Sequence, residues 1–177
     1  MILVALGANM AGPWGTPRQA VTHALRCMNG NGLRLVAASD LVETGPFGRL
    51  NQPDFINAVA AIETHLPPQA LLARLHAIER AAGRRRTMRW GPRTLDLDLL
   101  DYRGLILRGR QHATARGKLI LPHPGIAARR FVLEPLSAIA PSWRHPLLHA
   151  TARELLQRLR FGKGRVSNKR TRKRARP

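Results

Sequence analysis

Short apolar runs alternate with amphipathic stretches through the first half of the chain. The run "ILVALG" at residues 2–7 predicts a short buried strand, because it is brief, apolar and followed by a loop rich in Gly and Pro. Apolar residues then recur at helical spacing from Pro17 to Met28, and "NGNG" predicts the end of this first helix. Two extended segments are expected next, at residues 33–44 and 55–64.

A second amphipathic stretch, residues 69–82, places its apolar side chains on one face and precedes Gly83, so it predicts a helix with a glycine stop. Residues 83–92 predict a loop, whereas residues 93–102 alternate with period two as a strand does. The resulting order of strand, helix, strand, strand, helix, strand is typical of a ferredoxin-like α+β sandwich. In this class a mostly antiparallel sheet carries both helices on one face, and the other face would be open to ligands.

The rest of the chain completes this domain and then changes in composition. A strand or turn at residues 119–124, an apolar segment at 129–141 and a helix near 150–159 are expected. Residues 160–177 carry nine basic residues, no acidic residue and almost no apolar side chain, which predicts a disordered basic tail. We therefore expect one domain over residues 1–159 and a separate tail over residues 160–177.

The charge of the chain indicates an anionic ligand. It has 30 Lys and Arg against 10 Asp and Glu, a formal net charge of +20, and residues 1–159 alone retain 21 basic and 10 acidic side chains. A nucleotide phosphate or a nucleic acid would match this excess. We expect no membrane span, because no apolar run reaches about 18 residues, and no secretory signal, because the N-terminal apolar run has no preceding basic region and no small-residue cleavage pattern. The single cysteine, Cys27, excludes an internal disulfide framework and fits the cytoplasm, where we expect a monomer.

The scarce acidic residues concentrate in "RWGPRTLDLDLLDY", residues 89–102. Asp96 and Asp98 are two positions apart on the expected strand, so their carboxylates project from the same face while the neighbouring leucines enter the core. Two adjacent carboxylates repel each other unless a cation lies between them, and oxygen ligands of this kind suit Mg²⁺. A solvated acidic edge is the alternative and the commoner reason for such a pair. Asp101 falls outside the alternation and is expected to be an ordinary residue at the strand end.

Arginines flank these acids on the preceding loop, at Arg84, Arg85, Arg86, Arg89 and Arg93. Guanidinium groups bind phosphate in bidentate geometry and, together with Mg²⁺, neutralise the charge of a phosphoryl group during its transfer. A solvated basic loop is the alternative, but cations beside carboxylates favour a metal–nucleotide site. The sequence contains no G-x-x-x-x-G-K-[ST] motif, which excludes a Walker-type kinase.

Four further residues each allow two interpretations. His123 lies between two prolines in "LPHP", where it is either structural or a fixed hydrogen-bond donor to phosphate. Phe55 and Phe131 are either core residues or two aromatic faces for a flat heterocycle. Asn57 is either an amide at a strand edge or the group that reads such a ring. Residue types alone leave these alternatives open.

Three segments, in this order and spacing, closely resemble the family of 6-hydroxymethyl-7,8-dihydropterin pyrophosphokinases. They are "TGPFGRLNQPDFINAVAAIET" at 44–64, "GRRRTMRWGPRTLDLDLL" at 83–100 and "LPHPGIAARRFVLEPLSAIAP" at 121–141. The N-terminal "ALGAN" also resembles the opening strand and turn of that family, so the similarity covers about residues 2–141. The resemblance implies a ferredoxin-like fold and an ATP-dependent enzyme of folate biosynthesis, which transfers pyrophosphate from ATP to 6-hydroxymethyl-7,8-dihydropterin and releases AMP.

The resemblance also implies roles for individual residues. Asp96 and Asp98 correspond to the ligands of two Mg²⁺ ions that bridge ATP phosphates. The implied catalytic arginines are Arg84, Arg86 and Arg93, and the implied ATP-binding residues are Glu79, Trp90, Lys118, His123 and Arg129. The implied pterin-binding residues are Thr44, Gly45, Phe47, Phe55, Asn57 and Phe131.

Other functions remain open on the sequence. A nucleic-acid-binding protein would explain the charge of +20, and the tail of an enzyme could also touch RNA or another anionic surface weakly. An inactive paralogue would keep the motifs without the reaction. A D-x-D glycosyltransferase is disfavoured, because it needs a sugar-nucleotide domain larger than this chain offers.

Overall fold

A computed structural model describes residues 1–46, 51–84, 91–108, 113–114 and 117–162. Its main sheet has five strands in the order β2–β4–β1–β5, with β3 beside β4, and these pairings are antiparallel. The strands are β1 (Ile2–Ala8), β2 (Leu33–Ala38), β3 (Val42–Thr44), β4 (Phe55–Thr64) and β5 (Asp96–Tyr102), and a separate hairpin consists of β6 (Ala113–Thr114) and β7 (Gly117–Lys118). The helices are α1 (Pro17–Cys27), α2 (Pro68–Ala81), the 3-10 helix η2 (Ile126–Ala128), α3 (Arg130–Ile139) and α4 (Ala152–Gly162).

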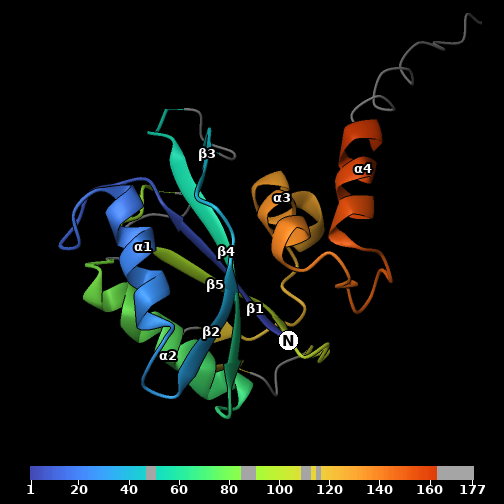
Figure 1. The fold of residues 1–177 in the computed structure, drawn as a ribbon, viewed down its shortest axis with the longest axis horizontal. Helices are drawn as coiled ribbons and strands as arrows, with labels where there is room; N and C mark the ends of the chain where they lie inside the picture. The colour runs from blue at the N-terminus through green and yellow to red at the C-terminus, as the bar shows by residue number, and fades with distance from the viewer. Residues whose placement is uncertain (47–50, 85–90, 109–112, 115–116, 163–177) are drawn as a thin grey trace, which may run out of the picture.

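Helices lie on both faces of the sheet (Figure 1). Helices α1 and α2 cover one face, where Val4, Leu97 and Leu71 belong to the same core. Helix α3 packs on the other face, where Leu3 and Leu133 belong to a second core, and α4 packs on the outer side of α3. The α+β sandwich with an antiparallel sheet is therefore confirmed, but the expectation of an open second face is wrong for the half that α3 and α4 cover. The apolar segment at 129–141 forms a helix that needs this face to bury its own apolar side.

Local signals position the two helices of the first face. Thr16 caps α1, accepting a hydrogen bond from the Gln19 backbone while the Gln19 side chain accepts one from the Thr16 backbone. Gly83 follows α2 with a φ of +80°, a left-handed conformation that glycine adopts without strain. Both helices match their expected ranges within one residue. In the described ranges, no helix has the length and apolar composition needed to cross a membrane.

Three expected boundaries differ from the observed ones. The segment 33–44, expected as one strand, runs along β4 as β2 and β3, because the Ser39 side chain accepts the Val59 N–H where a continuous strand would use its backbone. The expected strand 93–102 begins at Asp96. Helix α4 continues to Gly162, beyond the expected domain end at residue 159, and residues 163–177 of the expected tail lie outside the described residues.

Asp101 departs from the expectation of an ordinary strand-end residue. The register between β1 and β5 shifts by one residue at Leu100, so the alternation of side chains breaks there. Asp101 is consequently 2% exposed, and its Oδ2 accepts hydrogen bonds from the Gly104 N–H at 3.2 Å and Trp143 Nε1 at 3.4 Å. Burial raises the pKa of this carboxyl, against the hydrogen bonds and nearby positive charges, which lower it.

The strand register places the remaining chemical residues in one row. Asn57 of β4 pairs with Gly7 of β1, and Gly7 pairs on its other side with Asp96 of β5. Cross-strand partners project from the same face, so the three positions share the part of the sheet that α3 and α4 leave open. Ala5, the next position of β1 on that face, pairs with Asp98.

Candidate active site

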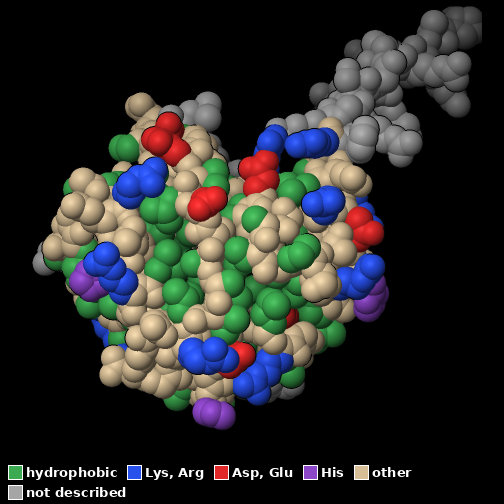
Figure 2. Space-filling model, viewed as in Figure 1, with side chains coloured by type: hydrophobic (Ala, Val, Ile, Leu, Met, Phe, Trp, Pro, Cys, Tyr) green, Lys and Arg blue, Asp and Glu red, His purple; other side chains and the backbone are tan. Residues whose placement is uncertain are grey.

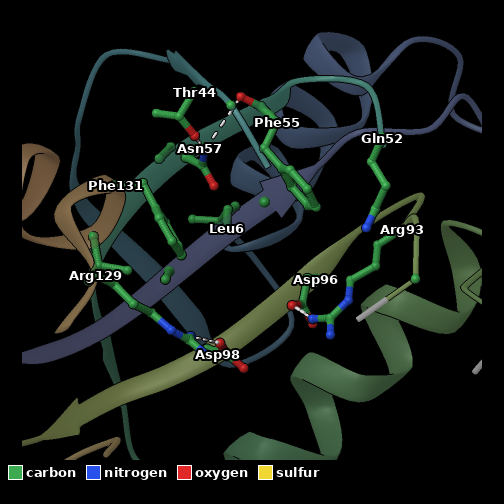
Figure 3. A pocket seen from close by; sticks show the side chains of 16 residues that line it. Leu6, Thr44, Gln52, Phe55, Asn57, Arg93, Asp96, Asp98, Arg129 and Phe131 are labelled. Atoms are coloured by element: carbon green, nitrogen blue, oxygen red, sulfur yellow. Dashed lines mark hydrogen bonds and ion pairs between the residues drawn. The ribbon is translucent and has the colours of Figure 1, made fainter. Parts of the chain in front are cut away.

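The open part of the sheet forms the floor of a cleft that is open to solvent. Phe55 from β4 and Phe131 from α3 stand on its two sides (Figure 3). Small residues of β1 and β4, Ala5, Gly7 and Ala58, contribute to the floor between them. The other lining residues are Leu6, Thr44, Gly45, Gln52, Asn57, Gly91, Arg93, Asp96, Asp98, Arg129 and Val132.

Asn57 is buried and oriented at one end of the cleft. Its Nδ2 donates to Thr44 Oγ1 at 2.8 Å and to the carbonyl of Phe55 at 3.4 Å. With the amide held in this way, its oxygen points toward the space between the two phenylalanines (Figure 3). Gly7 leaves room beside this oxygen, because a Cβ there would lie 3.2 Å from it. A fixed acceptor between two aromatic faces suits a flat heterocycle with N–H donors.

Asp96 and Asp98 project into the other end of the cleft, and the leucines that alternate with them are buried, as the period-two pattern predicts. Arg84 and Arg93 each form an ion pair with a different oxygen of Asp96. Arg129 donates to Asp98 Oδ2 at 3.0 Å. Three guanidinium groups thus converge on two carboxylates.

Glu79 of α2 supports the end of the cleft that carries Asp96 and Asp98. It is 1% exposed, pairs with Arg84, and accepts the N–H of Leu97 at 2.9 Å. Since Leu97 lies between the two aspartates, Glu79 fixes the strand segment that carries them. Burial lowers the pKa of the Arg84 guanidinium, while the charge of Asp98 raises it, and the flanking carboxylates keep this arginine cationic.

His123 lies beside Asp98, with 3.8 Å between its Nε2 and Asp98 Oδ2. Its backbone N–H donates to the Leu100 carbonyl at 2.8 Å, and its Nδ1 accepts the Gly125 N–H at 3.0 Å. Burial lowers the pKa of the imidazole, so the ring is neutral with its proton on Nε2, toward the cleft. Gly125 also makes room for Arg129, because a Cβ at Gly125 would lie 2.7 Å from the Arg129 Nε.

The sequence pattern does not single out two functional candidates, Asn9 and Gln52. Asn9 is buried, and its Nδ2 donates to Gln52 Oε1 at 3.3 Å and to the Pro53 carbonyl at 3.1 Å. Its Oδ1 accepts the Arg93 N–H at 2.8 Å. Asn9 thereby connects the segment before Phe55 with the arginine beside Asp96. No local pattern marks these residues, because their contacts join distant parts of the chain.

The carboxylates fit Mg²⁺ better than they fit a transition metal. Within the described ranges, no three His, Cys, Asp or Glu side chains gather as metal ligands. Asp96 and Asp98 are the two carboxylates among the described residues that line the cleft. Mg²⁺ is commonly bound by one or two carboxylates together with water and substrate phosphates.

Most of the predicted site residues come together in this cleft. Thr44, Gly45, Phe55, Asn57, Arg93, Asp96, Asp98, Arg129 and Phe131 line it, and Glu79, Arg84 and His123 lie against its charged residues. Phe47, Arg85, Arg86, Arg89 and Trp90 lie outside the described residues. Lys118 lies on β7 of the separate two-stranded sheet, and the position of its side chain lies outside the described part of the chain.

Comparison with known proteins adds independent information. The sequence profile of the family described as 7,8-dihydro-6-hydroxymethylpterin-pyrophosphokinase matches residues 3–141. The 2-amino-4-hydroxy-6-hydroxymethyldihydropteridine pyrophosphokinase of Pseudomonas aeruginosa is 43% identical over 146 residues, which cover 82% of this chain and 83% of that protein. The protein of the same name from Haemophilus influenzae is 40% identical over 138 residues, with 77% and 79% covered. The Folic acid synthesis protein fol1 of Schizosaccharomyces pombe is 38% identical over 128 residues, which cover 72% of this chain and 16% of that protein.

Proposed function

The chain belongs to the 7,8-dihydro-6-hydroxymethylpterin-pyrophosphokinase family, and we propose that the cleft on the open part of the sheet is its active site. The protein is an ATP-dependent pyrophosphokinase of folate biosynthesis, which transfers pyrophosphate from ATP to 6-hydroxymethyl-7,8-dihydropterin and releases AMP. The row of Asn57, Gly7 and Asp96 carries the proposal about the site. Two strand spacings separate Asn57 from Asp96 by roughly 10 Å, which leaves room for a pterin at one end and a polyphosphate at the other.

Positioning explains much of the reaction in this cleft. The hydroxymethyl oxygen of the pterin attacks the β-phosphorus of ATP, the bond from that phosphorus to the α,β-bridging oxygen breaks, and the hydroxyl proton is released. Phe55 and Phe131 would hold the ring between their faces, and the Asn57 oxygen would accept a hydrogen bond from its edge. A ring fixed in this way brings its hydroxymethyl group to the phosphate instead of leaving the encounter to diffusion.

Neutralisation of the phosphate charge is the second contribution of this cleft to the reaction. Arg93 and Arg129 lie where the phosphates would enter, and His123 can donate a hydrogen bond from Nε2. We propose that Asp96 and Asp98 hold two Mg²⁺ ions, which would neutralise phosphate oxygens when bound. Arg84, Arg86, Glu79, Trp90 and Lys118 keep their predicted roles on the ATP side, and Thr44, Gly45 and Phe47 keep theirs on the pterin side.

The nucleotide product tests the reaction. The purified protein, supplied with Mg²⁺, ATP and 6-hydroxymethyl-7,8-dihydropterin, should form AMP in equal amount to the pterin diphosphate, as measured by chromatography. No AMP should form when the pterin is left out. Formation of ADP would point to a different transfer, and no turnover at all would identify an inactive paralogue.

The metal role is tested separately with Asp96→Ala, which should lower kcat at least about a hundredfold because Mg²⁺ typically supplies several kcal/mol of charge stabilisation. Asp40→Ala is the matched control, since it removes the same charge from an exposed position that does not line the cleft. Near-normal kcat in Asp96→Ala would reject the metal role.

Nucleic-acid binding is a second candidate function, favoured by the net charge of +20. On the face in Figure 2, however, Lys and Arg side chains are spread around the edge instead of gathering in one patch. We propose that the catalytic domain, residues 1–159, works as a cytoplasmic monomer. Contacts with RNA or another anionic surface, where they occur, are assigned to the basic tail at residues 160–177 and are weak.

A further inference from the structure

The charged side chains at the acidic end of the cleft pair with one another. The acids are Glu79, Asp96 and Asp98, and the cations are Arg84, Arg93 and Arg129. Within the described ranges, the formal charges of these three acids and three arginines cancel. A cation that binds Asp96, or Oδ2 of Asp98, therefore competes with a guanidinium group that is already paired.

The three arginines differ in how deeply they are held. The side chain of Arg84 is 11% exposed and pairs with Glu79 as well as Asp96, so it keeps an anionic partner if Asp96 is taken by a metal. The side chains of Arg93 and Arg129 are 31% and 22% exposed and reach the aspartates from the cleft (Figure 3). These two can turn toward a ligand in the cleft without leaving a buried position.

We propose that Arg93 and Arg129 are exchangeable counter-ions. Without ligands they pair with Asp96 and Asp98. When a divalent cation binds these carboxylates, the two guanidinium groups move to the phosphate oxygens that bind together with the cation. The inference rests on the proposed function of the cleft. It implies that the divalent cation and the polyphosphate each raise the affinity for the other, since a coupling between two ligands is reciprocal.

The physical reason lies in what the displaced arginine gains. A divalent cation alone adds positive charge beside carboxylates that are already paired, and it leaves the displaced guanidinium close to the metal, which like-charge repulsion opposes. A polyphosphate gives the same guanidinium a bidentate partner and also supplies oxygen ligands to the metal. The exchange therefore proceeds readily when both ligands enter together, and each ligand alone binds weakly.

Mn²⁺ binding, measured by electron paramagnetic resonance without turnover, tests the exchange. The intact chain should bind Mn²⁺ on the order of tenfold more tightly in the presence of α,β-methylene ATP, whose α,β-bond is not cleaved. Arg129→Gln should bind Mn²⁺ alone roughly tenfold more tightly than wild type, and should show a smaller gain from the nucleotide. Arg130→Gln is the matched control and should behave as wild type, because Arg130 pairs with Glu134 and its side chain is 63% exposed.

Two results would overturn the proposal: equal Mn²⁺ affinity in Arg129→Gln and wild type, or a wild-type affinity that the nucleotide analogue leaves unchanged. Adding Asp98→Asn to Arg129→Gln should remove the tighter binding, and its persistence would place the ion elsewhere and also reject the exchange. AMP formation is measured independently. An intact Mn²⁺ exchange without AMP would reject the assigned reaction and leave the exchange standing.

Discussion

Gly7 lies between Asn57 and Asp96 in the sheet, and its missing side chain keeps the floor of the cleft open. We predict that Gly7→Ala weakens pterin binding by roughly tenfold, because the new Cβ would lie 3.2 Å from the Asn57 oxygen and force the amide to shift. The change should not unfold the protein, since alanine is favoured over glycine inside a strand. Fluorescence titration with the pterin measures the effect.

Affinity for ATP and the melting temperature, measured on the same Gly7→Ala preparation, are its controls, and both should stay near wild type. A variant that binds the pterin normally would show that the Asn57 oxygen does not accept a hydrogen bond from the pterin ring. A variant that loses ATP affinity as well would show that the two ends of the cleft do not act separately.

Asp101 gives a second prediction at the scale of the residue. Its folded pKa is raised above the ordinary value of 3.8, mainly by burial, so the folded state binds its proton more tightly than the unfolded state. The free energy of unfolding should therefore decrease as the pH rises from about 3.8 through the folded pKa, and this decrease should be weaker in Asp101→Asn. Urea unfolding at a series of pH values measures the slope.

The asparagine variant suits this test because an amide oxygen at the Oδ2 position can still accept from Gly104 and Trp143. Asp40→Asn, at an exposed position, is the control and should leave the slope as in wild type. If Asp101→Asn shows the wild-type slope, the decrease in this window does not come from Asp101.

At the scale of elements, Asn9 at the end of β1 joins the segment before β4 to the segment before β5. We predict that Asn9→Ala destabilises the protein by about 1–3 kcal/mol, because it removes the partner of a partly buried Arg93 N–H. It should also lower kcat more than it raises KM for ATP, since Arg93 beside Asp96 would lose one of the hydrogen bonds that hold its backbone, while those from the Asn9 and Met10 N–H groups to its carbonyl remain. Steady-state kinetics and urea unfolding measure the two effects.

Asn29→Ala, which changes the same side chain at an exposed position after α1, should leave both quantities unchanged. A destabilised Asn9→Ala with normal kcat would limit Asn9 to a structural role. A loss of kcat without destabilisation would instead show that the three hydrogen bonds serve positioning alone.

Elements with a strong local pattern could be predicted from the sequence, whereas the contacts between them could not. β4 has its expected bounds at 55–64 and α2 lies within one residue of its expected range, because alternation and helical spacing are local properties. The shift of register at Leu100 depends on pairing with β1 and has no local signal. The hydrogen bond between Asn9 and Arg93 spans 84 positions, so no local pattern predicts it. Only the family resemblance of "ALGAN" indicates that the segment with Asn9 belongs to the site.

In the candidate site too, features set by local spacing could be predicted, whereas contacts between distant segments could not. Asp96 and Asp98 could be placed on one face from their spacing, and the pairing of that face with Asn57 follows from the strand order. Their ion pairs with Arg93 and Arg129 could not be predicted, because charge in a sequence does not say which carboxylate a guanidinium will meet. The covering of half the second face by α3 and α4 likewise depends on how the last third of the chain folds back.

At the scale of the whole molecule, catalysis and the basic C-terminal segment should be separable. The cleft draws its described residues from β1 through α3, and α4 packs on α3 in the second core. We predict that ending the chain after Gly162 leaves kcat and KM unchanged. The same truncation removes eight of the 30 basic residues, so it should weaken RNA binding and flatten its dependence on salt.

Filter binding to a single-stranded RNA between 50 and 200 mM salt measures this last effect, where about eight phosphate contacts would change the affinity by roughly 10³–10⁵-fold. Arg129→Gln in the full chain is the opposite control: it should impair the reaction while RNA binding stays as in wild type, because it removes a cation from the cleft and leaves the tail intact. If the truncated chain bound RNA as tightly as the full chain, the basic excess of the domain itself would be the binding surface. The assignment of anionic contacts to the tail would then be wrong, while the pyrophosphokinase reaction, measured as AMP, would be unaffected.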